Sequence, residues 1–445
     1  MKDGKRALGI IWGWFSPSGI AAIKSLEKEG LLEVAAWFGH AEECSHHIND
    51  FVYKLKFLDP AYSGDCSHIT SSVLDAFPIF MDMYSRVSLS SGKPVQELKH
   101  IFHIYVDYFL HLIVGNKVDV VILSGPPVFG PDYILYRVAK ALKIKVIITY
   151  QSFFPNRFFY VKSLDDFGIF NDVSSEQDTR RISLPKGFRK DYIYMKNIKP
   201  VRHHCRSSLV ADLLQLANSR KRKPMSLSGV FQKYQACCEF RRFQSKTEVK
   251  HVNLDVPFVY FPLHLQPELT TSALGGEFAD QLSAIERLRV LIPDSWEIYV
   301  KENPKQKYRQ RGMYFYTRLA RIPGTTLLSR NIDTYSLIEK AKFTAVISGS
   351  AGWETICGGK SVLVFGRPWY LSLPGVVRYR EGVELKEIME YKHDHSLLEK
   401  EFGNLYRKMA PGVIDPGYAG LVKDYSDEEN SRLLQKFLER ILGDD

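Results

Sequence analysis

The stretch RALGIIWGWFSPSGIAAIKSLEKEGLLEVAAWFGH, residues 6–40, decides the fold class. Its two ends, 6–15 and 32–40, are apolar and predict strands, whereas the apolar residues between them recur at helical spacing, at Ile20, Ile23, Leu26 and Leu31. Gly30 fits the C-terminal stop of that helix. A strand, a helix and a strand of these lengths predict a βαβ unit with parallel strands.

The turn over 16–19 would then lie at the carboxyl end of the first strand, where open α/β sheets bind ligands. Because the turn is not GxGxxG, a nicotinamide cofactor is not indicated, and no other cofactor is expected.

The same alternation of short apolar strands and helices returns over 118–150 and again from about 256 to 366. Continuous β-branched strands are typical of a parallel sheet covered on both faces. We therefore predict the α/β class, with two Rossmann-like domains facing a central cleft. The predicted divisions are an N-terminal domain over 1–200, a basic connector over 201–250, a C-terminal domain over 251–385 and a helical tail over 386–445.

Three segments outside the alternating series carry further predictions. Residues 67–115 are expected to be mainly helical, and the charge and histidines within the apolar run 100–114 favour a buried helix over a membrane span. The aromatic-rich segment 151–168 is expected to be a loop at a strand end. The regular alternation of strands and helices fades over 170–250, which indicates a connector between the two domains.

The chain of 445 residues has 60 Lys and Arg against 50 Asp and Glu, a net charge of +10. Nine Lys and Arg face only two Glu between 220 and 250, so most of the excess is local. A solvated linker and a surface for anionic lipid headgroups both account for this charge, whereas no recognition motif for nucleic acid accompanies it.

Six scattered cysteines without the spacing of a zinc site favour a reducing compartment and no structural metal. The chain shows no signal peptide and no apolar run of membrane-spanning length. These features predict a cytoplasmic protein, with the inner face of the cytoplasmic membrane as a candidate peripheral location.

Polar residues follow three predicted strand ends in the second series. His264 and Glu268, in FPLHLQPE, suit acid–base work or a donor phosphate, with a purely structural histidine as the alternative. Lys301 and Asn303, in YVKENP, suit a phosphate, although a lysine beside a proline is also ordinary surface.

The third strand end carries a turn of small residues, ISGSAGWE over 347–354. Small residues let the backbone approach a ligand, and the N–H groups at the following helix attract phosphate. The candidate residues are Ser348, Gly349, Ser350 and Gly352, with Glu354 one turn later as a partner for a ribose diol or simply a favourable charge at the helix start. In the N-terminal half, Asp132 stands before a helix predicted over 133–143, either as its N-cap or as a catalytic carboxylate.

In this order, FPLHLQPELTTSALGGEFADQ, YVKENP and SGSAGWE resemble the capsule polysaccharide biosynthesis proteins, a bacterial group that includes Kdo transferases acting on lipid-linked glycans. The resemblance covers about 255–370, and only GPDYILYRVAK extends it into the N-terminal half. It implies a GT-B fold whose nucleotide-sugar donor contacts mainly the C-terminal domain. The serine and glutamate of the family correspond to Ser348 or Ser350 and Glu354, where they would hold the nucleotide.

The family associates a Lys-x-His-Pro motif with the donor phosphate, and here Asn303 replaces that histidine. An amide donates a hydrogen bond but neither carries charge nor exchanges a proton. The replacement therefore weakens the inference that the donor is CMP-Kdo.

The leading expectation is a metal-independent GT-B glycosyltransferase that moves a sugar, Kdo being one candidate, from a CMP-, UDP- or GDP-linked donor to a glycan or glycolipid of a bacterial capsule or lipopolysaccharide. Its catalytic candidates are His264, Glu268 and Asp132, and its donor-binding candidates are Lys301, Asn303, Ser348, Gly349, Ser350, Gly352 and Glu354. Two alternatives stay open: a sugar-nucleotide epimerase of the same fold, and a non-catalytic scaffold of a polysaccharide assembly complex.

Overall fold

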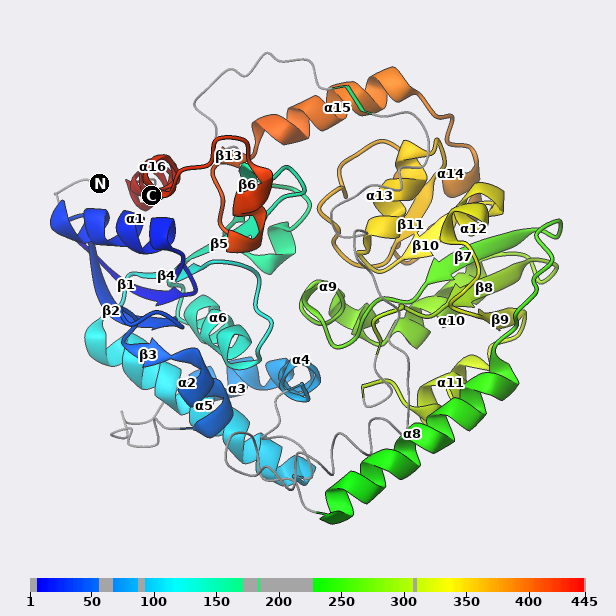
Figure 1. Ribbon diagram of the computed structural model, residues 1–445, viewed down its shortest axis with the longest axis horizontal. Helices are drawn as coiled ribbons and strands as arrows, with labels where there is room; N and C mark the ends of the chain where they lie inside the picture. The colour runs from blue at the N-terminus through cyan, green and yellow to red at the C-terminus, as the bar shows by residue number, and fades with distance from the viewer. Residues whose placement is uncertain are drawn as a thin grey trace. The chain divides into compact units, whose positions relative to one another are not determined.

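The computed structural model describes residues 6–55, 67–86, 93–170, 183–184, 227–306 and 310–443 (Figure 1). The chain forms two compact units. Unit 1 combines Met1–Ser183, Pro267–Leu274 and Ser396–Asp445, and unit 2 combines Leu184–Gln266 and Gly275–His395. Each unit holds one α/β sheet with Rossmann-like crossovers, which confirms the predicted fold class. The three boundaries between the four predicted segments stay predictions.

The sheet of unit 1 has the strand order β13-β6-β5-β4-β1-β2-β3 in its described part. The strands are β1 (Ala7–Trp12), β2 (Leu32–Gly39), β3 (His46–His47), β4 (Val120–Leu123), β5 (Lys145–Gln151), β6 (Arg157–Val161) and β13 (Ala410–Pro411). Strand β1 pairs in parallel with both β2 and β4. From β1 the chain continues outward on one side to β2 and β3, and from β4 on the other side to β5 and β6. The carboxyl ends of β1 and β4 are therefore the topological switch point of unit 1.

Helix α1 (Pro17–Lys28) connects β1 to β2, as the opening stretch predicted. The Ser16 side chain caps it by accepting from the N–H of Gly19 at 3.1 Å, and Gly30 follows it with a φ of +72°. Figure 1 shows α1 beside α16 (Asp427–Gly443), which returns from the far end of the chain. Together they cover one face of the sheet.

The other face of this sheet is covered by helices of the 67–116 segment and the crossover that follows it. These are α3 (Ser67–Val73), the 3-10 turn η1 (Leu74–Ala76), α4 (Phe77–Tyr84), α5 (Val95–Asn116) and α6 (Pro131–Ala141), with α2 (Ile48–Lys54) beside them. The helical prediction for this segment is confirmed in its described part. Helix α5 buries Ile101, Tyr105 and Phe109 among others, as predicted for a core helix. No helix in the described part of the chain is long and apolar enough to span a bilayer.

The expectation of a loop over 151–168 is wrong. Residues Arg157–Val161 form β6, which turns back antiparallel onto β5, and all five residues are buried. Phe158 and Tyr160 pack against Phe437 of α16, so tertiary packing recruits this aromatic run into the sheet. The 3-10 turn η3 (Leu164–Asp166) follows.

The sheet of unit 2 has the order β12-β11-β10-β7-β8-β9, with every pair parallel. The strands are β7 (Phe258–Pro262), β8 (Glu297–Lys301), β9 (Thr325–Leu328), β10 (Thr344–Val346), β11 (Val362–Val364) and β12 (Val376–Arg378). Here the chain runs outward from β7 to β9 on one side and from β10 to β12 on the other. The carboxyl ends of β7 and β10 are therefore the switch point of unit 2.

Side chains alternate between two helical layers along β7. Val259 and Phe261 pack toward α10 (Gln281–Leu291) and α11 (Met313–Leu319), whereas Phe258 and Tyr260 pack toward α12 (Thr334–Lys340). The remaining elements of the unit are α8 (Leu227–Thr247), the turn η5 (Gly276–Ala279), α13 (Ser350–Cys357) and α14 (Leu385–Met389).

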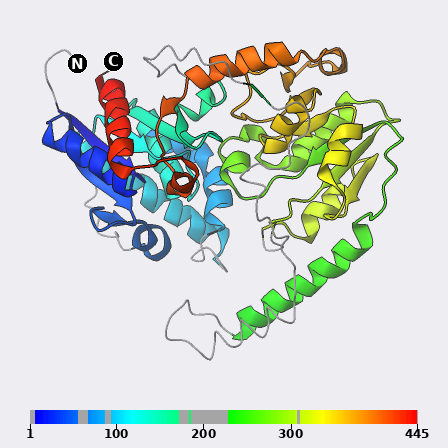
Figure 2. The ribbon, with the colours of Figure 1, turned by 45° about the horizontal axis from the view of Figure 1, so that its top comes forward.

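Within the predicted connector, residues 227–247 are helical. They form the single helix α8 seen in Figure 2, whose Phe240 packs on Tyr316 of α11. Residues 201–226 of the predicted connector, including the basic run 220–223, lie outside the described residues.

The tail over 386–445 is largely helical. It contains α14, α15 (His395–Arg407), the short turn η6 (Pro416–Leu421) and α16. The short strand β13 pairs antiparallel with β6, so this segment also extends the sheet of unit 1. One helical turn, α9 (Leu269–Ser272), follows β7.

Candidate functional site

Two of the predicted site segments meet at the switch point of unit 2. His264 lies two residues beyond β7, and Ser348 lies two residues beyond β10. The backbone N–H of Ser348 donates to Nε2 of His264 at 3.2 Å. Because open α/β sheets bind ligands at such switch points, this pair marks the place in unit 2 where a ligand is expected.

The small residues of the 348–352 turn are required by close packing. A Cβ on Gly349 would lie 2.5 Å from His264 Nε2, and a Cβ on Gly352 would lie 2.1 Å from the Tyr370 hydroxyl. That hydroxyl donates to the carbonyl oxygen of Gly349. His264 and Tyr370 thus hold the turn between them, and larger residues would displace it.

Helix α13 starts from this turn without a side-chain cap. Gly349 is its N-cap residue and offers no side chain to accept from the first-turn N–H groups. Such N–H groups, together with the positive end of the helix dipole, form a site for an anion.

His264 is held as a neutral imidazole. It is only 7% exposed, and burial lowers its pKa to about 3, with the nearby Arg311 charge adding to the lowering and the Pro262 backbone opposing it. Since Nε2 accepts the Ser348 N–H, the proton of the neutral ring is assigned to Nδ1. An imidazole arranged in this way positions the turn, and its predicted acid–base role stays a prediction.

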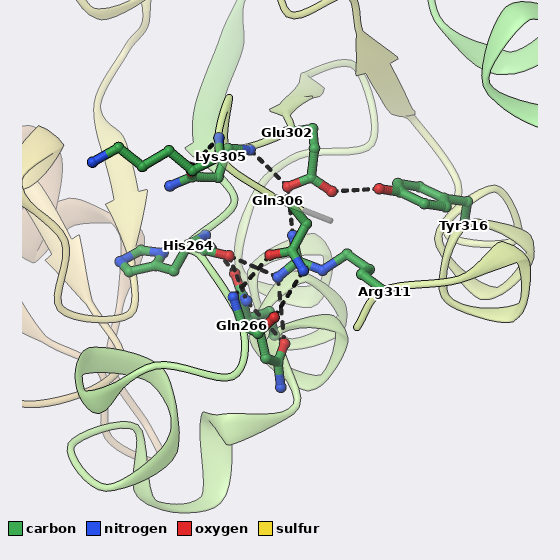
Figure 3. Close-up of polar contacts among 9 residues, drawn as sticks. His264, Gln266, Glu302, Lys305, Gln306, Arg311 and Tyr316 are labelled. Atoms are coloured by element: carbon green, nitrogen blue, oxygen red, sulfur yellow. Dashed lines mark hydrogen bonds and ion pairs between the residues drawn. The ribbon is translucent and has the colours of Figure 1, made fainter. Parts of the chain in front are cut away.

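A buried polar network that the sequence did not reveal lies behind His264 (Figure 3). Arg311 and Glu302 form an ion pair at 2.6 Å, with side chains 2% and 1% exposed. Arg311 also donates to the carbonyl oxygen of His264 at 2.7 Å, and Tyr316 donates to the second carboxylate oxygen of Glu302. The ion pair therefore fixes the backbone of His264.

Glutamine side chains complete this network. Gln281 Oε1 accepts the N–H of His264 at 2.8 Å, and its Nε2 donates to the carbonyl oxygen of the same residue at 3.2 Å. Gln306 bonds both the N–H and the carbonyl oxygen of Gln266, at 2.8 and 2.7 Å. Gln281 and Gln306 are fully buried. The backbone from 264 to 266 is thus held on both sides by amide groups.

Lys301 ends β8, but its amine is already engaged. It donates to the carbonyl oxygen of Ile332 and to Oγ1 of Thr334 at 2.7 Å, at the start of α12. Burial lowers its pKa to about 8, although Asp333 opposes the shift. A role at a phosphate stays a prediction and requires the amine to exchange these partners.

The remaining donor-binding candidates differ in exposure. Asn303 is half-buried, and its Oδ1 accepts the N–H of Lys305 at 2.9 Å. Glu354 is 3% exposed within α13. Burial raises the pKa of Tyr370, and the nearby Glu354 carboxylate adds to the rise. Their predicted contacts with a nucleotide stay predictions.

Glu268 and Asp132 belong to unit 1, not to the cluster around His264. Burial raises the pKa of Tyr150, with Tyr418 and then Glu268 adding to the rise, which places Glu268 near the end of β5. The structure thus assigns His264 and Glu268, four residues apart in the chain, to different units.

Asp132 does not stand before its helix. Helix α6 starts at Pro131 with Gly130 as its N-cap residue, so Asp132 is inside the first turn. Its carboxylate accepts from the N–H groups of Val128 at 2.6 Å and of Phe129 at 2.9 Å. Burial raises its pKa to about 6, although these N–H groups oppose the shift. These bonds close the loop before α6, and a catalytic role stays a prediction.

The sequence contains only an ambiguous signal for the buried network around Glu302 and Arg311. Glu302 stands inside the quoted YVKENP segment, yet charged residues at a strand exit are normally exposed. Its partner Arg311 lies nine residues later in a segment without regular pattern. Only the folded backbone brings the two side chains together.

Comparison with known protein families gives a match that includes the residues of this site. Residues 253–402 match the model of the family described as "Capsule polysaccharide biosynthesis protein". No curated protein matches the chain.

Solved structures give distant likenesses. A KpsC beta Kdo 2,7 transferase from Thermosulfurimonas dismutans is 12% identical, with a TM-score of 0.32, over 82% of this chain and 96% of that one. The UDP-GlcNAc 2-epimerase from Neisseria meningitidis bound to UDP-GlcNAc is 15% identical, with a TM-score of 0.24, over 98% of this chain and 100% of that one. The family match spans His264, the 348–352 turn and the Glu302–Arg311 pair. The resemblance to the capsule polysaccharide biosynthesis proteins is therefore confirmed for residues 253–402.

Proposed function

We propose that this protein is a glycosyltransferase of capsule polysaccharide biosynthesis that takes a sugar from a nucleotide-activated donor. One observation carries the proposal: at the switch point of unit 2, inside the segment that matches the family, His264 and Tyr370 hold a small-residue turn in front of the uncapped helix α13. This arrangement suits the phosphate of a nucleotide.

The N–H groups at the start of α13 are proposed to bind the donor phosphate. The turn before them is made of small residues, and His264 and Tyr370 hold it in place. In glycosyl transfer the departing nucleotide gains negative charge, and N–H groups fixed beforehand stabilise that charge without reorganising. The Lys301 amine, at the end of β8, is proposed to add a positive charge when a phosphate displaces its present partners.

The donor nucleotide is best identified by thermal stabilisation. A ligand that binds only the folded state raises the melting temperature by mass action. We expect one of CMP, UDP and GDP to do so for the wild type, and Gly349→Ala to abolish the shift because its Cβ would overlap His264. Gly420→Ala, where a Cβ meets nothing within 4 Å, is the matched control and should retain the shift. Equal shifts for all three proteins would exclude the turn as the nucleotide site.

Transfer itself requires an acceptor, which separates the proposal from its alternatives. Radiolabel from the donor sugar should appear in a glycan or glycolipid only when the acceptor is present. Conversion of the donor sugar without any acceptor would instead identify an epimerase. Nucleotide binding with neither reaction would favour a scaffold of an assembly complex. Docking on anionic lipids through the run at 220–223 stays a separate proposal, and loss of liposome binding on neutralising those four residues would support it.

A further inference from the structure

Unit 1 has a pocket at its own switch point, distinct from the candidate donor site in unit 2. The pocket has a volume of about 250 Å³ and is lined by Trp14, Phe15 and Ser16 after β1, by Ser124 after β4, and by 414–416 of the returning C-terminal segment. The position is the one where an open α/β sheet binds its ligand. The family match does not reach this pocket, whereas Ser16 in its lining belongs to the 16–19 turn that the sequence placed at a ligand-binding strand end.

The backbone that shapes the pocket is strained. Gly13 and Trp14 adopt φ values of +90° and +56°, directly after β1. Glycine is required at 13 because a Cβ there would lie 1.8 Å from the Ser124 hydroxyl oxygen. A bulky aromatic residue rarely takes a left-handed conformation, and such strain collects where a site needs a fixed shape.

This strained turn is held from both sides. Trp37 Nε1 donates to the carbonyl oxygen of Gly13 at 2.8 Å, and the N–H of Ser124 donates to the carbonyl oxygen of Trp12 at 2.9 Å. The turn is therefore fixed by neighbouring strands before any ligand arrives. A preformed pocket of this kind reduces the ordering cost of binding.

The chemistry of the lining points to a neutral sugar. It includes the aromatic residues Trp14 and Phe15, two serines and Asp415, and it contains no Lys or Arg among these residues. Asp415 accepts the N–H of Gly417 at 2.9 Å with one oxygen and has further acceptor capacity for ligand hydroxyls. A carboxylate without a cation repels phosphate and acidic sugars. The volume is below the roughly 300–1,000 Å³ of pockets for drug-sized ligands, which suits a single ring.

We propose that this pocket binds one neutral pyranose of a glycan. The inference deepens the proposed function, and it rests on that function only for the role of this sugar as the acceptor. Ring hydroxyls bond to Asp415 and Ser124, and the apolar face of the ring lies against Phe15, which is half-buried.

The test is direct binding to the full-length protein by saturation-transfer NMR. The probes are methyl glucoside and methyl galactoside as neutral sugars, with methyl glucuronide and inorganic phosphate as anionic ones. We expect a signal for a neutral glycoside that falls several-fold in Asp415→Asn and in Ser124→Ala. Asp415→Asn keeps the oxygen that accepts from Gly417, so the local turn is preserved. Asp424→Asn, an exposed change on the same segment, is the matched control and should leave the signal unchanged.

The outcomes separate this pocket from the donor site. The inference is overturned by absence of any neutral-sugar signal, by equal signals from the wild type and the pocket variants, or by stronger binding of methyl glucuronide or phosphate. The nucleotide-induced melting shift is measured on the same preparations, and Asp415→Asn should leave it unchanged. A lost sugar signal with a retained shift supports the pocket, whereas a missing shift in the wild type counts against the proposed function alone.

Discussion

At the scale of single residues, His264 links the site to the pH dependence of stability. Its pKa moves from 6.5 to about 3 on folding, so below about pH 6.5 the unfolded chain binds a proton that the fold excludes. This residue alone should lower the free energy of unfolding by about 2 kcal/mol between roughly pH 7 and pH 5. Asp132, whose pKa is raised to about 6, works in the opposite direction. The wild-type profile therefore contains both contributions.

Comparison with His264→Gln isolates the histidine. The variant should show a flatter dependence on pH in denaturant titrations, while His251→Gln, an exposed histidine of the same unit, should follow the wild type. Parallel profiles for wild type and His264→Gln would contradict the assignment of a buried neutral imidazole.

The Glu302–Arg311 pair makes a second prediction at this scale. Removing one partner leaves the other charge buried, which costs about 3–5 kcal/mol of unfolding free energy. Glu302→Gln and Arg311→Met should each approach that loss in urea titrations, and the double variant should lose less than their sum. The exposed pair of Arg432 and Glu428 is the control, because breaking it should cost at most about 1 kcal/mol. Strict additivity in the buried pair would show that the two charges do not depend on each other.

The sequence indicated a closely approached backbone at the 348–352 turn, but not the residues that pack against it. The small residues of ISGSAGWE identified a close backbone approach, and the structure gives the reason in the contacts of Gly349 and Gly352. The sequence did not reveal that the Lys301 amine is occupied by the α12 start, because side-chain direction depends on neighbouring elements. Buried partners such as Arg311 were missed for the same reason.

At the scale of elements, Gly352 in α13 is an exception to the rule that alanine stabilises a helix relative to glycine. Glycine within a helix normally costs about 0.5–1 kcal/mol relative to alanine. Gly352→Ala should nevertheless destabilise the protein and weaken nucleotide binding, because the Cβ would overlap the Tyr370 hydroxyl at 2.1 Å. Gly403→Ala in α15 is the matched control and should raise the melting temperature slightly, since its nearest contact is a flexible arginine at 3.9 Å.

Adding Tyr370→Phe to Gly352→Ala should restore part of the stability. It removes the overlapping oxygen but leaves a ring carbon 2.8 Å from the new methyl group. Calorimetry of the single and double variants measures the recovery. An unaltered melting temperature in Gly352→Ala alone would mean that α13 and Tyr370 separate easily.

Helices and strands were predictable where the spacing of apolar residues within the segment defines them. They were missed where they depend on packing against residues far away in the sequence. The βαβ unit of 6–40 follows from apolar spacing alone. Strand β6 was expected as a loop because its burial depends on Phe437, more than two hundred residues away. Helix α8 was missed because its residues are mostly polar, and its anchoring to unit 2 through Phe240 is again a distant contact.

At the scale of the whole molecule, unit 1 is assembled from both ends of the chain. Asn430 of α16 links the two ends by hydrogen bonds. Its Nδ2 donates to Ser18 Oγ at 2.8 Å and to the carbonyl oxygen of Val413 at 2.9 Å, and its Oδ1 accepts the N–H of Val413 at 2.7 Å. No local sequence pattern predicts that the C-terminal helix packs against the N-terminal part of the chain. The sequence therefore predicted a helical tail but not the elements on which it packs.

This closure predicts that damage to α16 is confined to unit 1. Leu438 is fully buried in the core shared with α1, so Leu438→Ala should cost about 2–5 kcal/mol. Hydrogen exchange followed by mass spectrometry should show faster exchange in β1 and β4, with β7, β8 and β10 of unit 2 protected as before. Lys436→Ala, an exposed change on the same helix, should leave both units unchanged. Because the candidate nucleotide site lies within unit 2, the melting shift caused by the nucleotide should survive Leu438→Ala. Loss of protection in both sheets would instead show that the two units unfold as one.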